Sequence, residues 1–227
     1  MSETPSVTVP GRGLPAGGPP ADALRELLSL DAREVAPLLL GALLTHEGRD
    51  GAVSVRITEV EAYLGPHDSL HPDPGSHTFR GATARNAVMF GPAGHLYVYF
   101  TYGMHHCANV VCGPEGVASA VLLRAGEIVA GEGLALARRP TSKSPKDLAS
   151  GPARLATALG ITTADSGRDA LQAPFRLELP QAQAADVSSG PRVGVSGAGG
   201  THDYPWRFWL SGDPTVSRYK AAKVRLA

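Results

Sequence analysis

The sequence has few cysteines, no excess of charge of either sign and no long apolar run. Its two cysteines, Cys107 and Cys112, provide no disulfide framework and favour a reducing compartment. Residues 1–20 lack the charged start and apolar run of a secretory signal, and no apolar stretch is long enough to span a membrane. We therefore expect a soluble, cytoplasmic protein that is neither secreted nor bound to a membrane.

Motifs of several large enzyme classes are also missing. No nucleotide-phosphate loop or glycine-rich dinucleotide fingerprint occurs at a strand–helix junction, and there is no serine elbow of the hydrolase type. These absences argue against phosphate-loop NTPases, dinucleotide-binding oxidoreductases and α/β-hydrolases.

Charge balances over the whole chain, with 21 Lys and Arg against 21 Asp and Glu, which counts against a nucleic-acid partner. The charge is nevertheless segregated, because residues 74–114 and 214–227 contain no Asp or Glu. A phosphate-facing surface is therefore compatible with the neutral total. The basic residues of these two stretches are Arg80 and Arg85 in the first and Arg218, Lys220, Lys223 and Arg225 in the second.

Apolar patterning and turn-forming residues predict one α+β domain. Residues 1–20 are rich in Pro, Gly, Ser and Thr and are expected to form a flexible tail, followed by the domain at 21–227. We expect a curved, mostly antiparallel β-sheet with flanking helices, and a long loop at 66–86. Helices are expected within 22–46 (one or two, with Asp31 as a cap), at 127–139 and at 148–159. Strands are expected at 53–63, 117–124, 192–195 and 207–210, and residues 95–112 are expected to form either two strands or a strand and a turn.

Glu61 is the first candidate for acid–base chemistry. Alternation over 53–63 places Glu59, Glu61 and Tyr63 on one face, together with Val53, Val55 and Ile57. Two carboxylates that are close and partly desolvated perturb one another's affinity for protons. The alternative is a pair of solvated carboxylates at a strand edge, and composition alone favours that alternative.

Three tyrosines form a second candidate group. Tyr97 and Tyr99 share one face of an expected strand, and Tyr102 follows at a turn. Flat side chains at strand ends can stack on a nucleobase, which contributes about 1–3 kcal/mol per base. The commoner role of a strand tyrosine is core packing with its hydroxyl hydrogen-bonded.

The histidines and cysteines are candidate zinc ligands. The spacing between them fits no common zinc pattern, and the adjacent His105 and His106 on a strand would point to opposite faces. We therefore expect no metal site. The residues considered are His67, His71, His77, His105, His106, Cys107 and Cys112.

Five segments together resemble the alkyladenine (3-methyladenine) DNA glycosylase family. Their order and approximate spacing match, and the resemblance covers most of the chain from residue 30 to the C-terminus. The segments are ITEVEAYLGP at 57–66, SHTFRGATARNAVMFGPAGHLYVYFTYGMHHCANVV at 76–111, AVLLRA at 120–125, SGPARL at 150–155 and RVGV at 192–195.

The resemblance implies a catalytic group of three residues. Glu61, in VEAY, is similar to the carboxylate that deprotonates the attacking water. Arg124, in LLRA, and the backbone carbonyl of Val193, in RVGV, match groups that hold this water.

It also implies a base pocket and a wedge. Tyr63 and Tyr99 match rings that stack on the flipped base, and His77 matches a side chain that lies against the base and can hydrogen-bond to it. Asn109 matches a residue whose amide disfavours the exocyclic amine of guanine. Tyr102 matches the residue that intercalates where the nucleotide has left.

One segment differs in length and composition among relatives, LGPHDSLHPDPGS between Tyr63 and His77. It contains His71, which competes with His77 for the pocket position. We choose His77 because Ser76-His77 leads into Arg80 and the TARN segment.

The resemblance implies a monofunctional DNA glycosylase that removes alkylated or deaminated purines in base excision repair. No lysine occupies a matching nucleophile position, so we expect attack by water and no strand cleavage. The expected partner is double-stranded DNA with damaged purines; we expect a monomer with no cofactor and no metal. Alternatives are a non-catalytic nucleic-acid-binding module, a glycosidase acting on nucleosides or RNA, and a zinc hydrolase.

Overall fold

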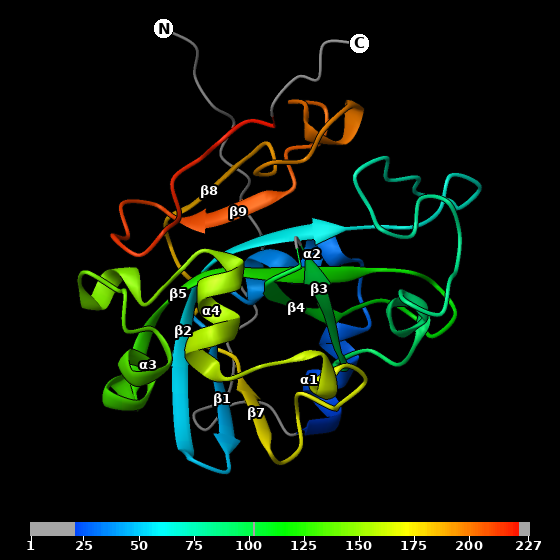
Figure 1. The fold of residues 1–227 in the computed structure, drawn as a ribbon. Helices are drawn as coiled ribbons and strands as arrows, with labels where there is room; N and C mark the ends of the chain where they lie inside the picture. Colours follow the sequence, from blue (N-terminus) through cyan, green and yellow to red (C-terminus); the bar gives the residue numbers. More distant parts are fainter. Residues whose placement is uncertain (1–20, 102, 223–227) are drawn as a thin grey trace, which may run out of the picture.

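The computed structural model describes residues 21–101 and 103–222, so the expected tail and Tyr102 lie outside the described residues. The described chain forms one curved sheet with helices beside it (Figure 1). All strand pairs in it are antiparallel, which confirms the expected α+β fold. The strands are β1 (Leu43–Gly48), β2 (Gly51–Tyr63), β3 (Leu96–Thr101), β4 (His105–Val111), β5 (Ala120–Ala130), β6 (Ala149–Ser150), β7 (Phe175–Glu178), β8 (Val187–Gly190) and β9 (Arg207–Leu210).

The sheet order is β3-β4-β5-β2-β1-β7, with β6 paired to β5 and the β8–β9 pair added beside β2. Strand β2 is therefore central: its first half pairs with β1, its second half with β9, and β5 runs along its other edge. Figure 1 shows β2 bending along its length. This bend lets one strand contribute to the main core and to the candidate site.

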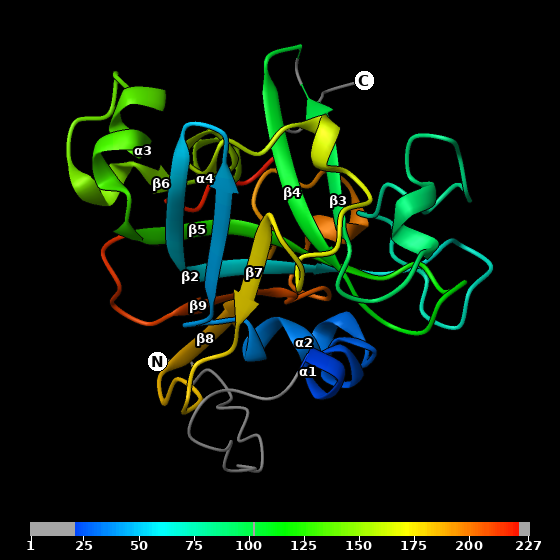
Figure 2. The ribbon, with the colours of Figure 1, turned by 90° about the horizontal axis from the view of Figure 1, so that it is seen from below.

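Four α-helices are present in the described residues, and Figure 2 shows α1 and α2 on one side of the sheet and α3 and α4 on the other. Asp31 caps α2, since its carboxylate accepts a hydrogen bond from the backbone N–H of Arg33. Pro152 begins α4 at its first position, where its fixed φ suits a helix start and its missing N–H is not needed. The helices are α1 (Ala21–Leu28), α2 (Ala32–Leu38), α3 (Glu132–Arg138) and α4 (Pro152–Leu159), with short 3₁₀ turns η1 (Ala87–Phe90), η2 (Pro145–Asp147), η3 (Thr163–Asp165) and η4 (Ala198–Gly200).

The main apolar core joins the leucine-rich faces of α1, α2 and α4 to the sheet. A second, smaller cluster around Met89, Tyr97, Val111 and Ala120 is packed by Tyr63 and Tyr99 and is separate from the main core. Within the described residues, no helix is long and apolar enough to cross a membrane.

Three sequence expectations about the elements are wrong. Residues 43–46 form the start of β1, because Leu43 and Leu44 pair with β2 and β7 on both edges. Residues 127–130 continue β5, so the helix expected there begins only at Glu132. Residues 192–195 form a loop rather than a strand, and the late strand is β8 at Val187–Gly190. In the first two cases strand pairing overrides local propensity.

The expected single face of residues 53–63 is also wrong, because β2 contains a bulge. Pairing with β5 skips Thr58, which makes the alternation change phase there. Before the bulge, odd-numbered residues such as Ile57 enter the main core; after it, Val60 and Ala62 do. The bulge thereby turns Glu59, Glu61 and Tyr63 to the opposite face.

Candidate active site

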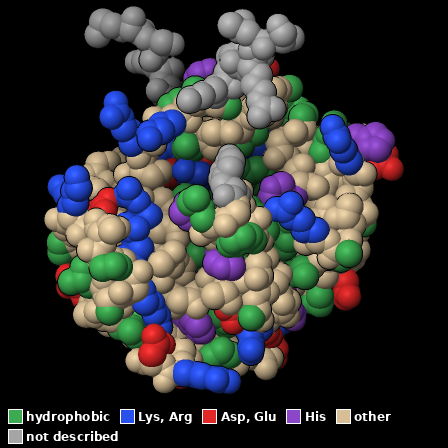
Figure 3. All heavy atoms as spheres, in the orientation of Figure 1, with side chains coloured by type: hydrophobic (Ala, Val, Ile, Leu, Met, Phe, Trp, Pro, Cys, Tyr) green, Lys and Arg blue, Asp and Glu red, His purple; other side chains and the backbone are tan. Residues whose placement is uncertain are grey.

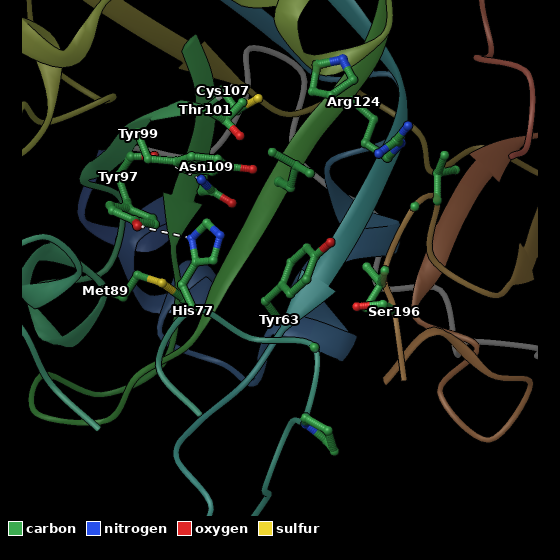
Figure 4. A pocket seen from close by; sticks show the side chains of 17 residues that line it. Tyr63, His77, Met89, Tyr97, Tyr99, Thr101, Cys107, Asn109, Arg124 and Ser196 are labelled. Atoms are coloured by element: carbon green, nitrogen blue, oxygen red, sulfur yellow. Dashed lines mark hydrogen bonds between the residues drawn. The ribbon is translucent and has the colours of Figure 1, made fainter. Parts of the chain in front are cut away.

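A pocket of about 360 Å³ lies beside the smaller apolar cluster, lined by the end of β2 and by residues along β3, β4 and β5. Figure 4 shows side chains from these strands and from two loops converging on it. The face drawn in Figure 3 carries Lys and Arg side chains at the upper left, over the C-terminal segment drawn red in Figure 1. The pocket is lined by Tyr63, Pro74, Gly75, His77, Met89, Tyr97, Tyr99, Thr101, Cys107, Asn109, Leu122, Arg124, Pro152, Val193, Gly194, Val195 and Ser196.

Two irregularities in the β2–β5 pairing place the charged side chains of Glu61 and Arg124 on the side of the sheet where the pocket lies. Val60 pairs with Leu123 and Glu59 with Ala125, so Arg124 has no partner in the register. An extra residue bends a strand locally and redirects its side chain. The bulges at Thr58 on β2 and Arg124 on β5 thus bring Glu61 and Arg124 together.

Glu61 is fully buried directly behind the pocket wall. Its Oε1 accepts a hydrogen bond from the backbone N–H of Val193 at 2.6 Å and lies 3.3 Å from Nη1 of Arg124. Its Oε2 accepts from the Tyr63 hydroxyl at 2.8 Å. All three partners line the pocket, so this carboxylate is in contact with the cavity wall at both oxygens.

The aromatic part of the pocket is built on β3 and the loop that carries His77. The His77 ring lies edge-on to Tyr99, with centroids 4.5 Å apart, and its Nδ1 is 3.2 Å from the Tyr97 hydroxyl. The amide of Asn109 donates to the backbone carbonyl of Tyr97 at 2.9 Å, which fixes its orientation. Figure 4 shows His77, Tyr99 and Asn109 on one side of the pocket and Tyr63 on the other.

Burial keeps the phenol and thiol groups of the pocket in their neutral forms. Desolvation, and then the charge of Glu61, raises the pKa of Tyr63 well above its ordinary value. Desolvation also raises the pKa of Tyr99 and of Cys107. Burial lowers the pKa of Arg124, but Glu61 and Glu59 outweigh this effect and raise it, so its guanidinium stays charged. The site therefore combines an anion–cation pair with neutral rings.

The structure brings together most of the residues singled out from the sequence. Tyr63, His77, Tyr99, Asn109, Arg124 and Val193 line the pocket, and Glu61 contacts three lining residues. Val193 contacts Glu61 through its backbone N–H. The expected role of the Val193 carbonyl, which is to hold the attacking water, stays a prediction. Tyr102 lies outside the described residues.

The rival pocket histidine and the zinc candidates are placed differently. His71 does not line the pocket, whereas His77 does. Cys107 faces the pocket, while Cys112 lies in the main core. Within residues 21–101 and 103–222, no group of three or more His, Cys, Asp or Glu side chains is placed to hold a metal ion.

Comparison with known proteins decides the family, because residues 26–214 match the methylpurine-DNA glycosylase (MPG) family. The chain belongs to this family. Proteins named "Putative 3-methyladenine DNA glycosylase" are similar to this family member over nearly their whole length. One from Leifsonia xyli is 57% identical over 202 residues, 86% of this chain and 92% of the relative. One from Streptomyces avermitilis is 56% identical over 208 residues (88% and 93%), and one from Mycobacterium tuberculosis is 48% identical over 197 residues (86% and 93%).

Two further residues of this methylpurine-DNA glycosylase family member, Arg192 and Asp73, were not among the predicted site residues. The two form a fully buried ion pair with N–O distances of 2.7 and 2.6 Å. The Arg192 guanidinium also lies 4.5 Å from the centroid of the Tyr63 ring, on which it stacks. Arg192 is the first residue of the RVGV segment, but no sequence signal pairs it with Asp73, which lies 119 positions away.

We expect the imidazole of His77 to be neutral at pH 7. Packing against the tyrosine rings, and then the charge of Arg85, lowers its pKa below the ordinary 6.5. Because its pKa is lower in the folded state, the unfolded chain takes up this proton first. The contribution of His77 to the stability of the folded state is therefore present above pH 6.5 and falls as the pH drops below that value. An NMR titration assigned with His77→Gln should give a midpoint below 6.5; a midpoint at or above that value contradicts this.

Proposed function

We propose that this family member is a monofunctional DNA glycosylase that flips damaged purines out of the duplex and hydrolyses their bond to the sugar. One observation carries the proposal: the buried carboxylate of Glu61 contacts Tyr63, Arg124 and Val193 of one pocket. A general base beside a cavity lined by aromatic rings is what water attack on an everted nucleotide requires.

In the proposed reaction, Glu61 removes a proton from water that is held next to Arg124 and the carbonyl of Val193. The oxygen forms a bond to the anomeric carbon, and the bond to the purine breaks with its electron pair moving to the base. Positive charge develops on the sugar during this step, and a nearby carboxylate stabilises it. Arg124 stays protonated and holds the anion and the water in place.

Tyr63 and Tyr99 are proposed to hold the base between their rings. Alkylation at a ring nitrogen makes a purine cationic, and aromatic faces attract a cation by about 0.5–2 kcal/mol. Both phenols are kept neutral by burial, so the rings carry no charge of their own. This arrangement favours alkylated purines over normal ones.

A deaminated purine carries no charge, so hydrogen bonds have to supply recognition. In the proposal, the Tyr97 hydroxyl donates to Nδ1 of His77, which leaves Nε2–H as a donor to the base. The neutral imidazole expected from its lowered pKa suits this role. The Asn109 amide, held by the Tyr97 carbonyl, is proposed to disfavour guanine.

Extruding the nucleotide costs a few kcal/mol, roughly, and less where the base is damaged or mispaired. Tyr102, which lies between β3 and β4 in the sequence, is proposed to fill the space left in the duplex. None of the lysines in the described residues lines the pocket. A Schiff base is therefore not part of the proposal, and water is the nucleophile.

The test uses duplexes that each carry one defined lesion, with released bases identified by mass spectrometry. We expect release of methylated purines or hypoxanthine from double-stranded DNA, leaving strands that break only after alkaline treatment. Equal rates on the free nucleoside would favour a nucleoside glycosidase instead. Binding without release would favour a non-catalytic module, and breakage without alkali would contradict a monofunctional enzyme.

A further inference from the structure

A second buried carboxylate, Glu59, lies two residues before Glu61 on the same side of β2 after the bulge. Its Oε1 accepts hydrogen bonds from Nε of Arg124 at 3.0 Å and Nε of Arg207 at 2.6 Å. Its Oε2 accepts from the backbone N–H of Ser217 at 2.7 Å. Of these partners only Arg124 lines the pocket, so Glu59 reaches the site through that residue alone.

Arg124 is shared between the two carboxylates. Its Nε binds Glu59, its Nη2 donates to the Ser217 hydroxyl at 3.4 Å, and its Nη1 faces Glu61 at 3.3 Å. A guanidinium is planar and rigid, so fixing Nε and Nη2 determines where Nη1 points. Glu59 and Ser217 therefore set the orientation in which Arg124 meets the general base.

Ser217 connects this network to the C-terminal segment. Its carbonyl also accepts a hydrogen bond from Nη2 of Arg207 at 3.0 Å, so its backbone N–H and C=O and its side chain are all bound. The exposed Arg218 and Lys220 follow within three residues. The loop that carries the basic residues is thus anchored on the carboxylate that also anchors Arg124.

We propose that Glu59 is a positioning residue of the active site, holding Arg124 against Glu61 and fixing Ser217 beside it. This rests on the proposed role of Glu61 as the general base. In the buried network of Glu59, Glu61, Arg124 and Arg207, the charges of two carboxylates balance those of two guanidiniums. Without the charge of Glu59, Nε of Arg124 loses its ion pair, and the orientation in which Nη1 meets Glu61 is no longer fixed.

The test compares Glu59→Gln with the wild type in single-turnover excision from a lesion duplex. Gln keeps the side-chain size and one acceptor but removes the charge. We expect the rate to fall about ten- to a hundredfold, as a misplaced catalytic group would cause, while the Kd for lesion DNA stays within about threefold. Asp169→Asn, which neutralises a carboxylate paired with Arg25 away from the pocket, is the control and should keep the wild-type rate. A rate for Glu59→Gln within about twofold of wild type overturns the proposal.

A double-mutant cycle with Arg124→Gln separates positioning from a general loss of structure. If Glu59 acts through Arg124, adding Glu59→Gln to Arg124→Gln should change the rate by less than about twofold. Effects that multiply overturn the proposal. Ser217→Ala leaves every charge in place and is the milder second variant, useful if Glu59→Gln folds poorly. It should slow excision roughly two- to tenfold, and this effect too should vanish in the Arg124→Gln background.

Failure of this inference is distinct from failure of the proposed function. If the wild type releases no base from any duplex, or if Glu61→Gln excises at the normal rate, the proposed function is wrong. If Glu61→Gln is inactive but the Glu59 and Ser217 variants behave additively with Arg124→Gln, only the role of Glu59 is wrong.

Discussion

Glu61→Gln is expected to lower the single-turnover rate of base excision by about two to four orders of magnitude, the range in which general bases contribute. The amide cannot accept the proton of the attacking water, and it leaves the developing sugar cation without its anion. Kd for the lesion duplex should change little, because the pocket rings and the exposed basic residues are untouched. Excision is measured on a hypoxanthine duplex with enzyme in excess.

Glu127→Gln is the matched control for this experiment. Glu127 lies on β5, which pairs with β2, but it is exposed and bound to Arg56 at the far end of the strand. It should excise at the wild-type rate. Glu61→Gln also keeps one acceptor for Val193 or Tyr63, and Arg124 retains Glu59, so the variant is expected to fold. Excision by a folded Glu61→Gln at near the wild-type rate would rule out a general base at this position.

Asp73→Asn is expected to lower the free energy of unfolding by about 3–5 kcal/mol, the cost of leaving a buried charge without its partner. Asp73 and Arg192 both have no exposed side-chain surface. Burial lowers the pKa of Arg192, but the hydrogen bonds and charge of Asp73 outweigh it, so the pKa is raised and the guanidinium remains a cation. Asn can offer only one acceptor and no charge to that cation.

Denaturant unfolding of the wild type and of Asp73→Asn measures the difference in their free energies of unfolding. Glu178→Gln serves as the comparison, because its pair with Arg176 is exposed on both sides and should contribute about 1 kcal/mol or less. Asp73 also accepts hydrogen bonds from the backbone of Leu64 and Gly75, so it ties the loop before His77 to β2. If Asp73→Asn and Glu178→Gln lose the same free energy of unfolding, the buried pair contributes no more to stability than the exposed one.

The sequence predicted the strand at 53–63, extended structure within 95–112 and the cap at Asp31, because these depend on local alternation, turns and side-chain hydrogen bonds. It failed where pairing between distant segments decides the conformation. Residues 43–46 carry leucines that suit a helix, yet two neighbouring strands recruit them into β1. RVGV at 192–195 has the pattern of a strand, yet it forms a loop in which the Val193 N–H binds Glu61 and Arg192 stacks on Tyr63.

The residue types needed for the chemistry were determined by the sequence alone: an acid, an arginine and tyrosines at spacings that resemble one enzyme family. Only the tertiary structure decided that they meet. Glu61 lies on the pocket side of β2, behind the lining residues, because the bulge at Thr58 reverses the alternation of this strand, and Arg124 meets it because β5 carries a matching irregularity. Bulges depend on the pairing of two strands, and buried ion pairs on segments far apart along the chain, so neither has a signature within a short stretch of sequence.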